Sequence, residues 1–381
     1  MNDTILIIVI YVVSMFLLDR AFRRANILTE QTLSRSSPID ALRGLLATAV
    51  VCHHFVVTYY WKVDGKWVRP ESDVLNNMGA VPVSLFFMIT GFLFFGKIYR
   101  RSPDWGVILR SRIQRIMPLY IFVVFIVFGI SLIKTGFVIE VGRIVKEALL
   151  WGVFVGSSLN GFSDSTRITA GAHWTLRYEW LFYFSLPIVA AIFNGKLYGK
   201  YLILSLAVMV LAIPSIYFGF IVPKLALLFF IGFIPVLIKA HFPRFLSVVG
   251  HKLSSLVSLV FLIFGMFIAQ EYSVAQMLVL GVSFVMIALG DNVFGVLKSN
   301  GLKSLGEVSY SIYLTHGLVL YLLFSVFKVF SFEGGDMLYY IAFLPVVLAL
   351  VSASSVVTFL IIEKPFILVR GKKVYSEKVA E

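Results

Sequence analysis

Long apolar runs alternate with short polar segments along almost the whole chain. The runs are about 16 to 25 residues long, and a helix of about 20 residues crosses the hydrocarbon core of a membrane. The pattern therefore predicts an all-α fold, a polytopic membrane helical bundle of about eleven transmembrane helices. The predicted spans are residues 4–18, 40–60, 80–97, 118–134, 176–194, 201–221, 224–239, 252–269, 274–290, 308–330 and 338–362.

The loops between these spans differ in charge. With the N-terminus placed outside, the inside loops hold 22 lysines and arginines and the outside loops hold 9. Basic loops favour the cytoplasmic side, so the asymmetry predicts an outside N-terminus and a cytoplasmic C-terminus. Basic residues beside anionic lipid also account for the net charge of +13, and we therefore expect no nucleic-acid partner.

The same pattern divides the chain into three regions. Residues 1–38 hold the first span and a basic cytoplasmic linker, residues 39–366 form the main membrane domain, and residues 367–381 form a basic cytoplasmic tail. Within the long outer segment 135–175, the apolar stretch near 144–156 is expected to form a short surface or re-entrant helix. No residues have the spacing of a metal site, and we expect no permanently bound cofactor.

His54 and Arg43 are ionisable residues inside one predicted span. Charged or titratable groups at bilayer depth are costly and are therefore candidates for function. Eleven residues of helix fall within about 20° of three full turns, so Arg43 and His54 share one helix face, about 16 Å apart. His53 points about 80° away from that line. The alignment suggests one elongated ligand held at two points.

Glu179 lies four to six residues into the span that enters from outside at 176. Its predicted depth of about 6–9 Å agrees with that of His54, about 9 Å from the outer surface. A carboxylate within reach of the imidazole would orient it and stabilise its cation, as a general base needs. The alternative is that each residue is a packed polar group bonded to a helix carbonyl or to water.

Arg112 and Arg115 stand three residues apart at the inner end of the span that begins at 118. On a helix they share a face, where two guanidinium groups can bind phosphates bidentately. The alternative is ordinary anchoring of the cytoplasmic side by basic residues.

Two further pairs carry weaker signals. Thr90 and Gly91 form a small pair among aromatic residues, which permits close helix approach, and simple packing is the favoured explanation of the pair. Tyr313 and His316 share a helix face, where they line the same cavity as His54 or bond to a neighbouring helix.

Together these runs resemble the acyltransferase-3 family of integral membrane acyltransferases. The motifs follow the family's order between residues 40 and 366. They are Arg43 with His54 eleven positions later, Phe86 to Phe92, Arg112 to Arg115 with Pro118, Trp174 to Trp180 with Phe182 and Tyr183, Ser309 to His316, and Glu363 to Phe366. The chain departs from the family in two places: Thr90 stands where a serine is more usual, and the span 4–18 is extra to the family's ten.

The resemblance implies an enzyme that moves an acyl group, expected to be acetyl, from cytoplasmic acyl-CoA to a hydroxyl of a cell-surface or secreted glycan. On this interpretation His54 is the general base and Glu179 orients it. The donor-binding residues are Arg43, Arg112 and Arg115, and the cavity or acceptor-binding residues are Trp174, Tyr178, Thr90, Tyr313 and His316. The expected partners are acyl-CoA, a glycan or lipid-linked saccharide, and membrane lipid, in a bacterial plasma (inner) membrane.

Two other classes of function stay open. A transporter or flippase of a lipid-linked sugar or acyl group would use the same polar stripe as a pathway. That class favours internal repeats and broken spans in matching halves, and neither is visible in the sequence. The other class is a non-catalytic membrane partner of a polysaccharide synthase.

Overall fold

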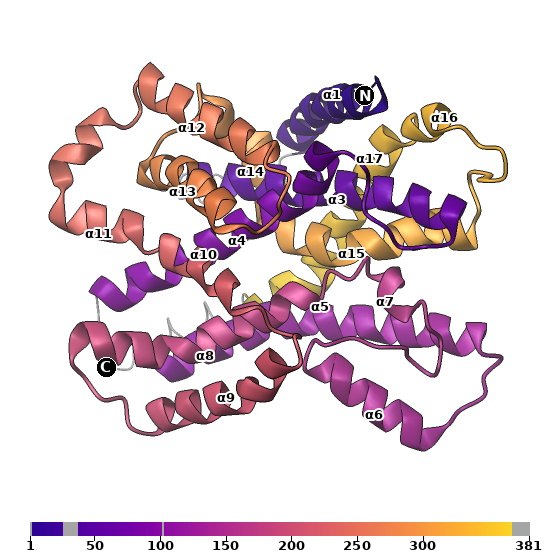
Figure 1. Cartoon of the computed structure of the whole chain (residues 1–381), viewed down its shortest axis with the longest axis horizontal. Coiled ribbons are helices and arrows are strands. Elements are labelled where there is room, and N and C mark those ends of the chain that lie inside the picture. Colours follow the sequence, from indigo (N-terminus) through magenta and orange to yellow (C-terminus); the bar gives the residue numbers. More distant parts are fainter. Residues whose placement is uncertain (1, 26–36, 101–102, 368–381) are drawn as a thin grey trace. The chain divides into compact units, whose positions relative to one another are not determined.

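The computed structural model describes residues 2–25, 37–100 and 103–367, and these are helical almost throughout (Figure 1). In the described residues β geometry is limited to one isolated bridge, between Leu159 and Phe162. The all-α prediction is therefore confirmed. The basic linker at 26–36 and the tail at 368–381 lie outside the described residues.

Within that part of the chain, nine helical segments are long and apolar enough to cross a membrane. They make the protein a multi-pass membrane protein. The segments are α1 (Asn2–Ala25), α3 (Pro38–Asp64), α4 (Asp73–Arg100), α5 (Trp105–Lys134), α8 (Trp174–Asn194), α9 (Lys200–Tyr217), α10 (Ala226–Ile231) with α11 (Ile234–His241), α15 (Ser309–Tyr321), and α16 (Met337–Ile341) with α17 (Leu344–Thr358). Two shorter apolar helices, α12 (Lys252–Met266) and α13 (Val274–Leu289), occupy the predicted spans 252–269 and 274–290.

The segment between α5 and α8 is folded rather than extended. It contains α6 (Val141–Gly152) and the single turn α7 (Ser165–Ile168). The apolar stretch near 144–156 was expected to be helical, and α6 confirms a helix there. At 12 residues α6 is too short to cross a bilayer.

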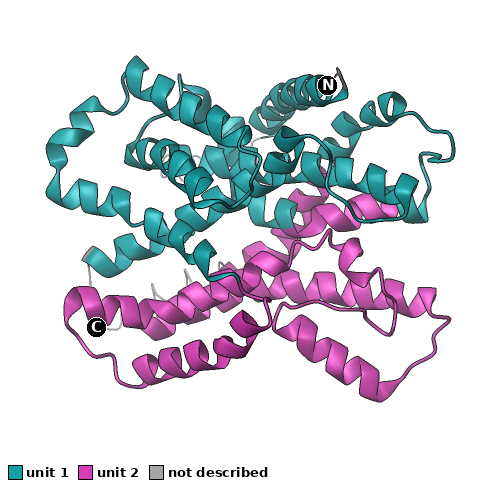
Figure 2. Ribbon diagram, in the orientation of Figure 1, with its two compact units in different colours: residues 1–100, 222–313, 323–350 teal, residues 101–221, 314–322, 351–381 magenta. Residues whose placement is uncertain are grey.

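The chain forms two compact units, coloured separately in Figure 2. Unit 1 consists of residues 1–100, 222–313 and 323–350, and unit 2 consists of residues 101–221, 314–322 and 351–381. Each unit joins segments that are distant in sequence, and α15 and α17 contribute residues to both.

In unit 1, the short helix α14 (Asn300–Glu307) packs tightly against α3. A Cβ atom added at Gly44 would stand 2.7 Å from the Leu302 carbonyl oxygen, and one at Gly306 would overlap the Asp40 backbone. Only glycine fits at either position, so this contact fixes the first turns of α3, next to Arg43.

Helix α1 packs in the same part of unit 1, beside α3 and α14. Its Asp19 accepts hydrogen bonds from the Ser299 hydroxyl and, at 3.1 Å, from the Leu302 N–H in the first turn of α14. Its Tyr11 hydroxyl donates to the Leu45 carbonyl of α3 at 3.1 Å. The span extra to the family's ten is therefore a packed element of unit 1, with a side chain that caps a neighbouring helix.

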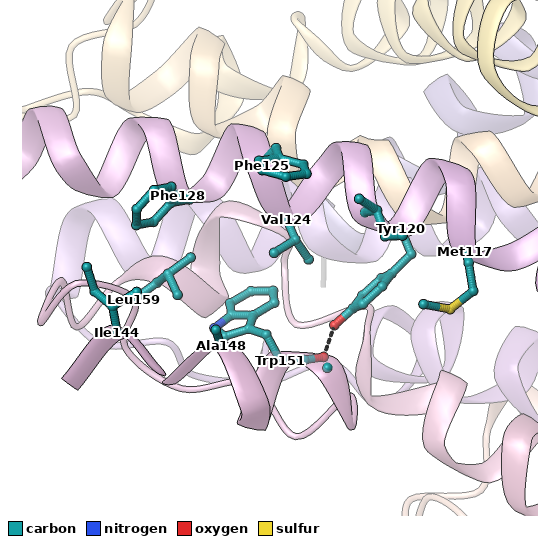
Figure 3. A pocket seen from close by; sticks show the side chains of 11 residues that line it. Met117, Tyr120, Val124, Phe125, Phe128, Ile144, Ala148, Trp151 and Leu159 are labelled. Atoms are coloured by element: carbon teal, nitrogen blue, oxygen red, sulfur yellow. Dashed lines mark hydrogen bonds between the residues drawn. The ribbon is translucent and has the colours of Figure 1, made fainter. Parts of the chain in front are cut away.

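In unit 2, an apolar cavity of about 300 Å³ lies between α5 and α6 (Figure 3). The hydroxyl of Tyr120 points toward α6 and donates to the Trp151 carbonyl at 2.5 Å. The lining is otherwise apolar, and none of the predicted site residues contributes to it. The lining residues are Met117, Tyr120, Ile121, Val124, Phe125, Phe128, Ile144, Ala148, Trp151, Gly152 and Leu159.

Candidate active site

The predicted site residues divide between the two units. Unit 1 contains Arg43, His54, Thr90 and Tyr313, and unit 2 contains Arg112, Arg115, Trp174, Tyr178, Glu179 and His316. Because His54 and Glu179 belong to different units, their pairing stays a prediction from the sequence.

Helix α3 begins at a strong start signal in the sequence. Ser37 and Asp40 form a capping box in which the Ser37 N–H donates to Asp40 Oδ2 at 2.8 Å, and Pro38 occupies the first helical position. The helix then runs unbroken to Asp64. Arg43 and His54 therefore lie on one continuous helix, and Arg43 Nη1 stands 3.9 Å from Asp40 Oδ1.

The hydrogen bond of His54 fixes its tautomer. Its Nδ1 lies 3.2 Å from the Val50 carbonyl oxygen, one turn earlier on α3. A carbonyl only accepts, so Nδ1 carries the proton and the lone pair of the neutral ring is on Nε2. A histidine in this tautomer can accept a proton at Nε2.

The neighbouring His53 has different partners. Its Nδ1 donates to the Leu75 carbonyl of α4 at 2.8 Å, and its ring packs against Gly79, where an added Cβ would lie 2.7 Å from Cδ2. The ring centroids of His53 and His54 are 4.9 Å apart. His53 therefore holds α3 against α4, as the different helix face predicts.

The loop between α3 and α4 brings one tryptophan close to His54, and a second tryptophan contacts the first. The Trp67 ring centroid is 6.2 Å from that of His54, and Trp67 also meets Trp61 edge to face at 5.5 Å. Sequence reasoning missed Trp67, because it lies in the loop after α3 and its return toward His54 depends on the path of that loop. Trp61 had a visible signal: it follows His54 by seven residues and so shares its helix face.

Thr90 and Gly91 are at a close helix crossing in unit 1. A Cβ atom at Gly91 would overlap the Phe229 carbonyl of α10, and one at Gly232 would overlap the Met88 carbonyl of α4. The close approach expected of this pair is present, and the contact accounts for Gly91 by packing alone.

The residues on α15 are buried. The ring of Tyr313 meets Phe86 of α4 edge to face, with centroids 6.1 Å apart. His316 is fully buried one turn later, and α15 continues into a π-helical turn, η4 (Leu322–Val326). Single π-helical turns are frequent at functional sites, and a second one, η5 (Phe359–Glu363), ends α17 with the buried Glu363.

In unit 2, Tyr183 links two of the predicted residues. Its hydroxyl donates to Glu179 Oε2 at 2.8 Å, one turn earlier on α8. The guanidinium carbon of Arg112, on α5, lies 5.9 Å from the centre of the Tyr183 ring. Glu179 and Arg112 were assigned separate roles from the sequence, yet one buried tyrosine contacts both.

Arg115 has a buried donor that lacks a partner. Its Nη2 atom is buried and makes no hydrogen bond to any described residue. Buried guanidinium donors are nearly always paired, so this atom fits a site for an anionic group such as a phosphate. Arg112 and Arg115 lie on the helical part of α5 and therefore share a face, as the spacing predicts.

The start of α8 is packed with aromatic residues. Trp174 and Tyr178 meet edge to face with centroids 5.5 Å apart. His173 precedes them as the N-cap residue, lies 4.8 Å from the ring of Trp151, and contacts the Thr169 hydroxyl at 3.2 Å. Burial lowers the pKa of His173 to about 4, so its ring is neutral at physiological pH. This buried histidine was not among the predicted site residues.

Across the described ranges, no group of three or more His, Cys, Asp or Glu side chains could hold a metal ion. The acyltransferase-3 family model, described as an acyltransferase domain, matches residues 38–362. The match begins at α3, contains every predicted site residue and leaves out α1. No curated protein and no solved structure matches the chain.

Proposed function

The chain belongs to the acyltransferase-3 family, whose members transfer acyl groups, and from this premise we propose an O-acyltransferase that acts on a glycan. In this proposal the donor is cytoplasmic acyl-CoA, with acetyl as the acyl group, and the acceptor is a hydroxyl of a cell-surface or secreted glycan or of a lipid-linked saccharide. The protein would lie in a bacterial inner membrane with its N-terminus outside and its C-terminus in the cytoplasm.

The observation that carries the proposal is the hydrogen bond between His54 Nδ1 and the Val50 carbonyl oxygen. With Nδ1 donating to the Val50 carbonyl, Nε2 is the atom that accepts the proton of the acceptor hydroxyl. As that proton leaves, the hydroxyl oxygen attacks the thioester carbon, the C–O bond of the ester forms and the C–S bond breaks. The CoA thiolate leaves and takes up the proton from the imidazolium, so the enzyme returns to its starting state.

The donor is proposed to bind through Arg43, Arg112 and Arg115, whose guanidinium groups suit the phosphates of CoA. The buried Nη2 of Arg115 supports this role, because an anionic ligand would supply the acceptor that the described residues do not. CoA is a substrate here, and no resident cofactor is required.

Glu179 is proposed to orient His54 and to stabilise its cation while the proton is held. Trp174 and Tyr178, in the first turns of α8, are assigned to the acceptor, and Thr90, Tyr313 and His316 to the walls of the cavity. The link from Glu179 through Tyr183 to Arg112 supports a carboxylate that is held in one orientation.

The test compares surface glycans from cells with the protein, without it, and with the His54→Ala variant. We expect an ester, detected by mass, that is lost in the last two, and a rate of acyl transfer from acyl-CoA that falls about 10²- to 10⁴-fold in His54→Ala membranes. His53→Ala is the matched control and should retain transfer, although the loss of its packing against α4 should lower thermal stability. An unchanged glycan, or movement of a lipid-linked saccharide that survives His54→Ala, would favour the transporter alternative.

A further inference from the structure

The loop between α3 and α4 returns toward His54. From His54 to Asp64 the helix continues for ten residues, about 15 Å. Gly65, with φ of 68°, then ends the helix and reverses the chain. Two residues later the Trp67 ring lies 6.2 Å from the His54 ring, with an angle of 31° between their planes.

This loop is fixed at two points in unit 1. The Asn76 amide donates to the Pro70 carbonyl at 2.7 Å, and Arg69 Nη1 lies 3.3 Å from Glu271 Oε2 in the loop between α12 and α13. Pro70 itself is buried. These contacts tie the loop that carries Trp67 to α4 and to the loop between α12 and α13.

A second indole supports the first. Trp61, a buried residue of α3, meets Trp67 edge to face at 5.5 Å, and the Lys62 ammonium lies 4.1 Å from the centre of the Trp61 ring. Trp67 is only partly buried. Tryptophans often mark the membrane interface, but that role does not require an indole to lie beside an imidazole.

We propose that Trp67, supported by Trp61, is a saccharide-binding subsite that places the acceptor sugar beside His54. The proposal rests on the acyltransferase function above and adds a part of the site that holds the acceptor, besides Trp174 and Tyr178. The C–H groups on the face of a sugar ring carry partial positive charge and pack against the negative face of an indole. A ring stacked on Trp67 would present its hydroxyls toward an imidazole whose centre lies 6.2 Å from the indole.

The experiment uses the full chain in liposomes, acetyl-CoA, and unacylated glycan isolated from cells that lack the protein. Trp67→Ala should raise the KM for the glycan roughly five- to tenfold and leave the KM for acetyl-CoA unchanged. Trp67→Phe keeps an aromatic face and should restore most of the affinity. Val68→Ala, a truncation of the next residue in the same loop, should behave as the wild type.

Three results would overturn the subsite. One is a Trp67→Ala variant whose glycan KM stays within about twofold of the wild type. Another is an equal rise of both KM values, which would mean a general distortion of the site. The third is a loss of inserted protein with normal kinetics per folded molecule, which would make Trp67 a membrane-interface anchor only. If the wild type itself transfers no acyl group to the glycan, the proposed function fails and the subsite fails with it.

Discussion

The hydroxyl of Tyr183 donates to Glu179 Oε2 at 2.8 Å, across one turn of α8. The tyrosine is 2% exposed, and Arg112 lies over its ring. The hydrogen bond fixes the orientation of the Glu179 carboxylate from within α8. Through the ring of Tyr183 it also links Glu179, which is proposed to orient His54, with Arg112, which is proposed to bind the donor.

Tyr183→Phe should therefore lower kcat about tenfold, because it removes a hydrogen bond to a charged group while leaving the ring beside Arg112. Steady-state kinetics in liposomes, with acetyl-CoA and glycan varied in turn, would measure the change. Tyr198→Phe is the matched control, since the buried Tyr198 hydroxyl has no hydrogen-bond partner in the described part of the chain. Equal rates in the two variants would show that the bond to Glu179 plays no part in catalysis.

Arg115→Ala should raise the KM for acyl-CoA about tenfold to a hundredfold and leave the KM for the glycan nearly unchanged. The reason is that the variant loses the charge-assisted hydrogen bonds from the Arg115 guanidinium to a phosphate of the donor. Arg115→Lys should restore only part, since an ammonium cannot form the bidentate fork. Arg110→Ala, at an exposed position on the same helix, is the control. An unaltered KM for acyl-CoA would mean that Arg115 does not bind the donor and serves only as a basic anchor at the cytoplasmic side.

Asp19→Ala should lower the free energy of unfolding by about 1 kcal/mol, because the third N–H of α14 loses its acceptor. Thermal unfolding in detergent would detect it, with Arg20→Ala, an exposed neighbour on α1, as the control. Asp19→Asn keeps an accepting oxygen and should cost less. A full effect in Asp19→Asn would indicate that the ion pair with Arg23, rather than the cap, is the stabilising contact.

The pattern of apolar runs was enough to predict the fold class and the helical segments, but the helix ends depend on local contacts. The span predicted to begin at 118 begins at Trp105, because Asp104 accepts a hydrogen bond from the Val107 N–H at 3.0 Å and starts the helix before the apolar run. The span predicted over 224–239 is interrupted between α10 and α11. At that break Gly232 touches the backbone of α4, a contact that periodicity cannot reveal.

Single-helix spacing explains which candidate residues could be predicted. Arg43 with His54 and Arg112 with Arg115 lie on single helices, where geometry follows from residue number. Trp67 reaches His54 through a loop, and Arg112 reaches Tyr183 between two helices. The residue spacing along a single helix therefore predicts neither contact. The Tyr183 bond to Glu179 did have a signal, since residues four apart on a helix are neighbours.

We expect His173 to make the stability of unit 2 depend on pH. An imidazole in the unfolded chain binds a proton near pH 6.5, whereas burial lowers the pKa of the folded His173 to about 4. Between these values the unfolded state binds more protons, so stability is complete above about pH 6.5 and falls as the pH drops toward about 4, by about 3 kcal/mol in all.

Limited proteolysis of the segment 135–173 at pH 7 and pH 5 would measure this loss, and cleavage should be faster at pH 5. His173→Phe keeps a ring against Trp151 and cannot be protonated, so its cleavage rate should change much less with pH. A variant with the same pH dependence as the wild type would exclude His173 as the titrating group.

The pairing of His54 with Glu179 can be tested by non-additivity. Groups that act as one catalytic unit lose nearly as much singly as together, so His54→Ala combined with Glu179→Gln should be no slower than His54→Ala alone. Glu179→Gln by itself keeps the shape and removes the charge, which should lower the basicity of the imidazole and the rate of transfer. Because the weakened base loses its proton at lower pH, the rate of Glu179→Gln should reach its plateau at a lower pH than that of the wild type, below the wild-type maximum. The comparison needs kcat/KM for the wild type, both single variants and the double variant under identical conditions.

If the loss in the double variant equals the product of the two single losses, the residues act separately. Glu179, held by Tyr183, would then serve the acceptor sugar, and His54 would act without a carboxylate from α8.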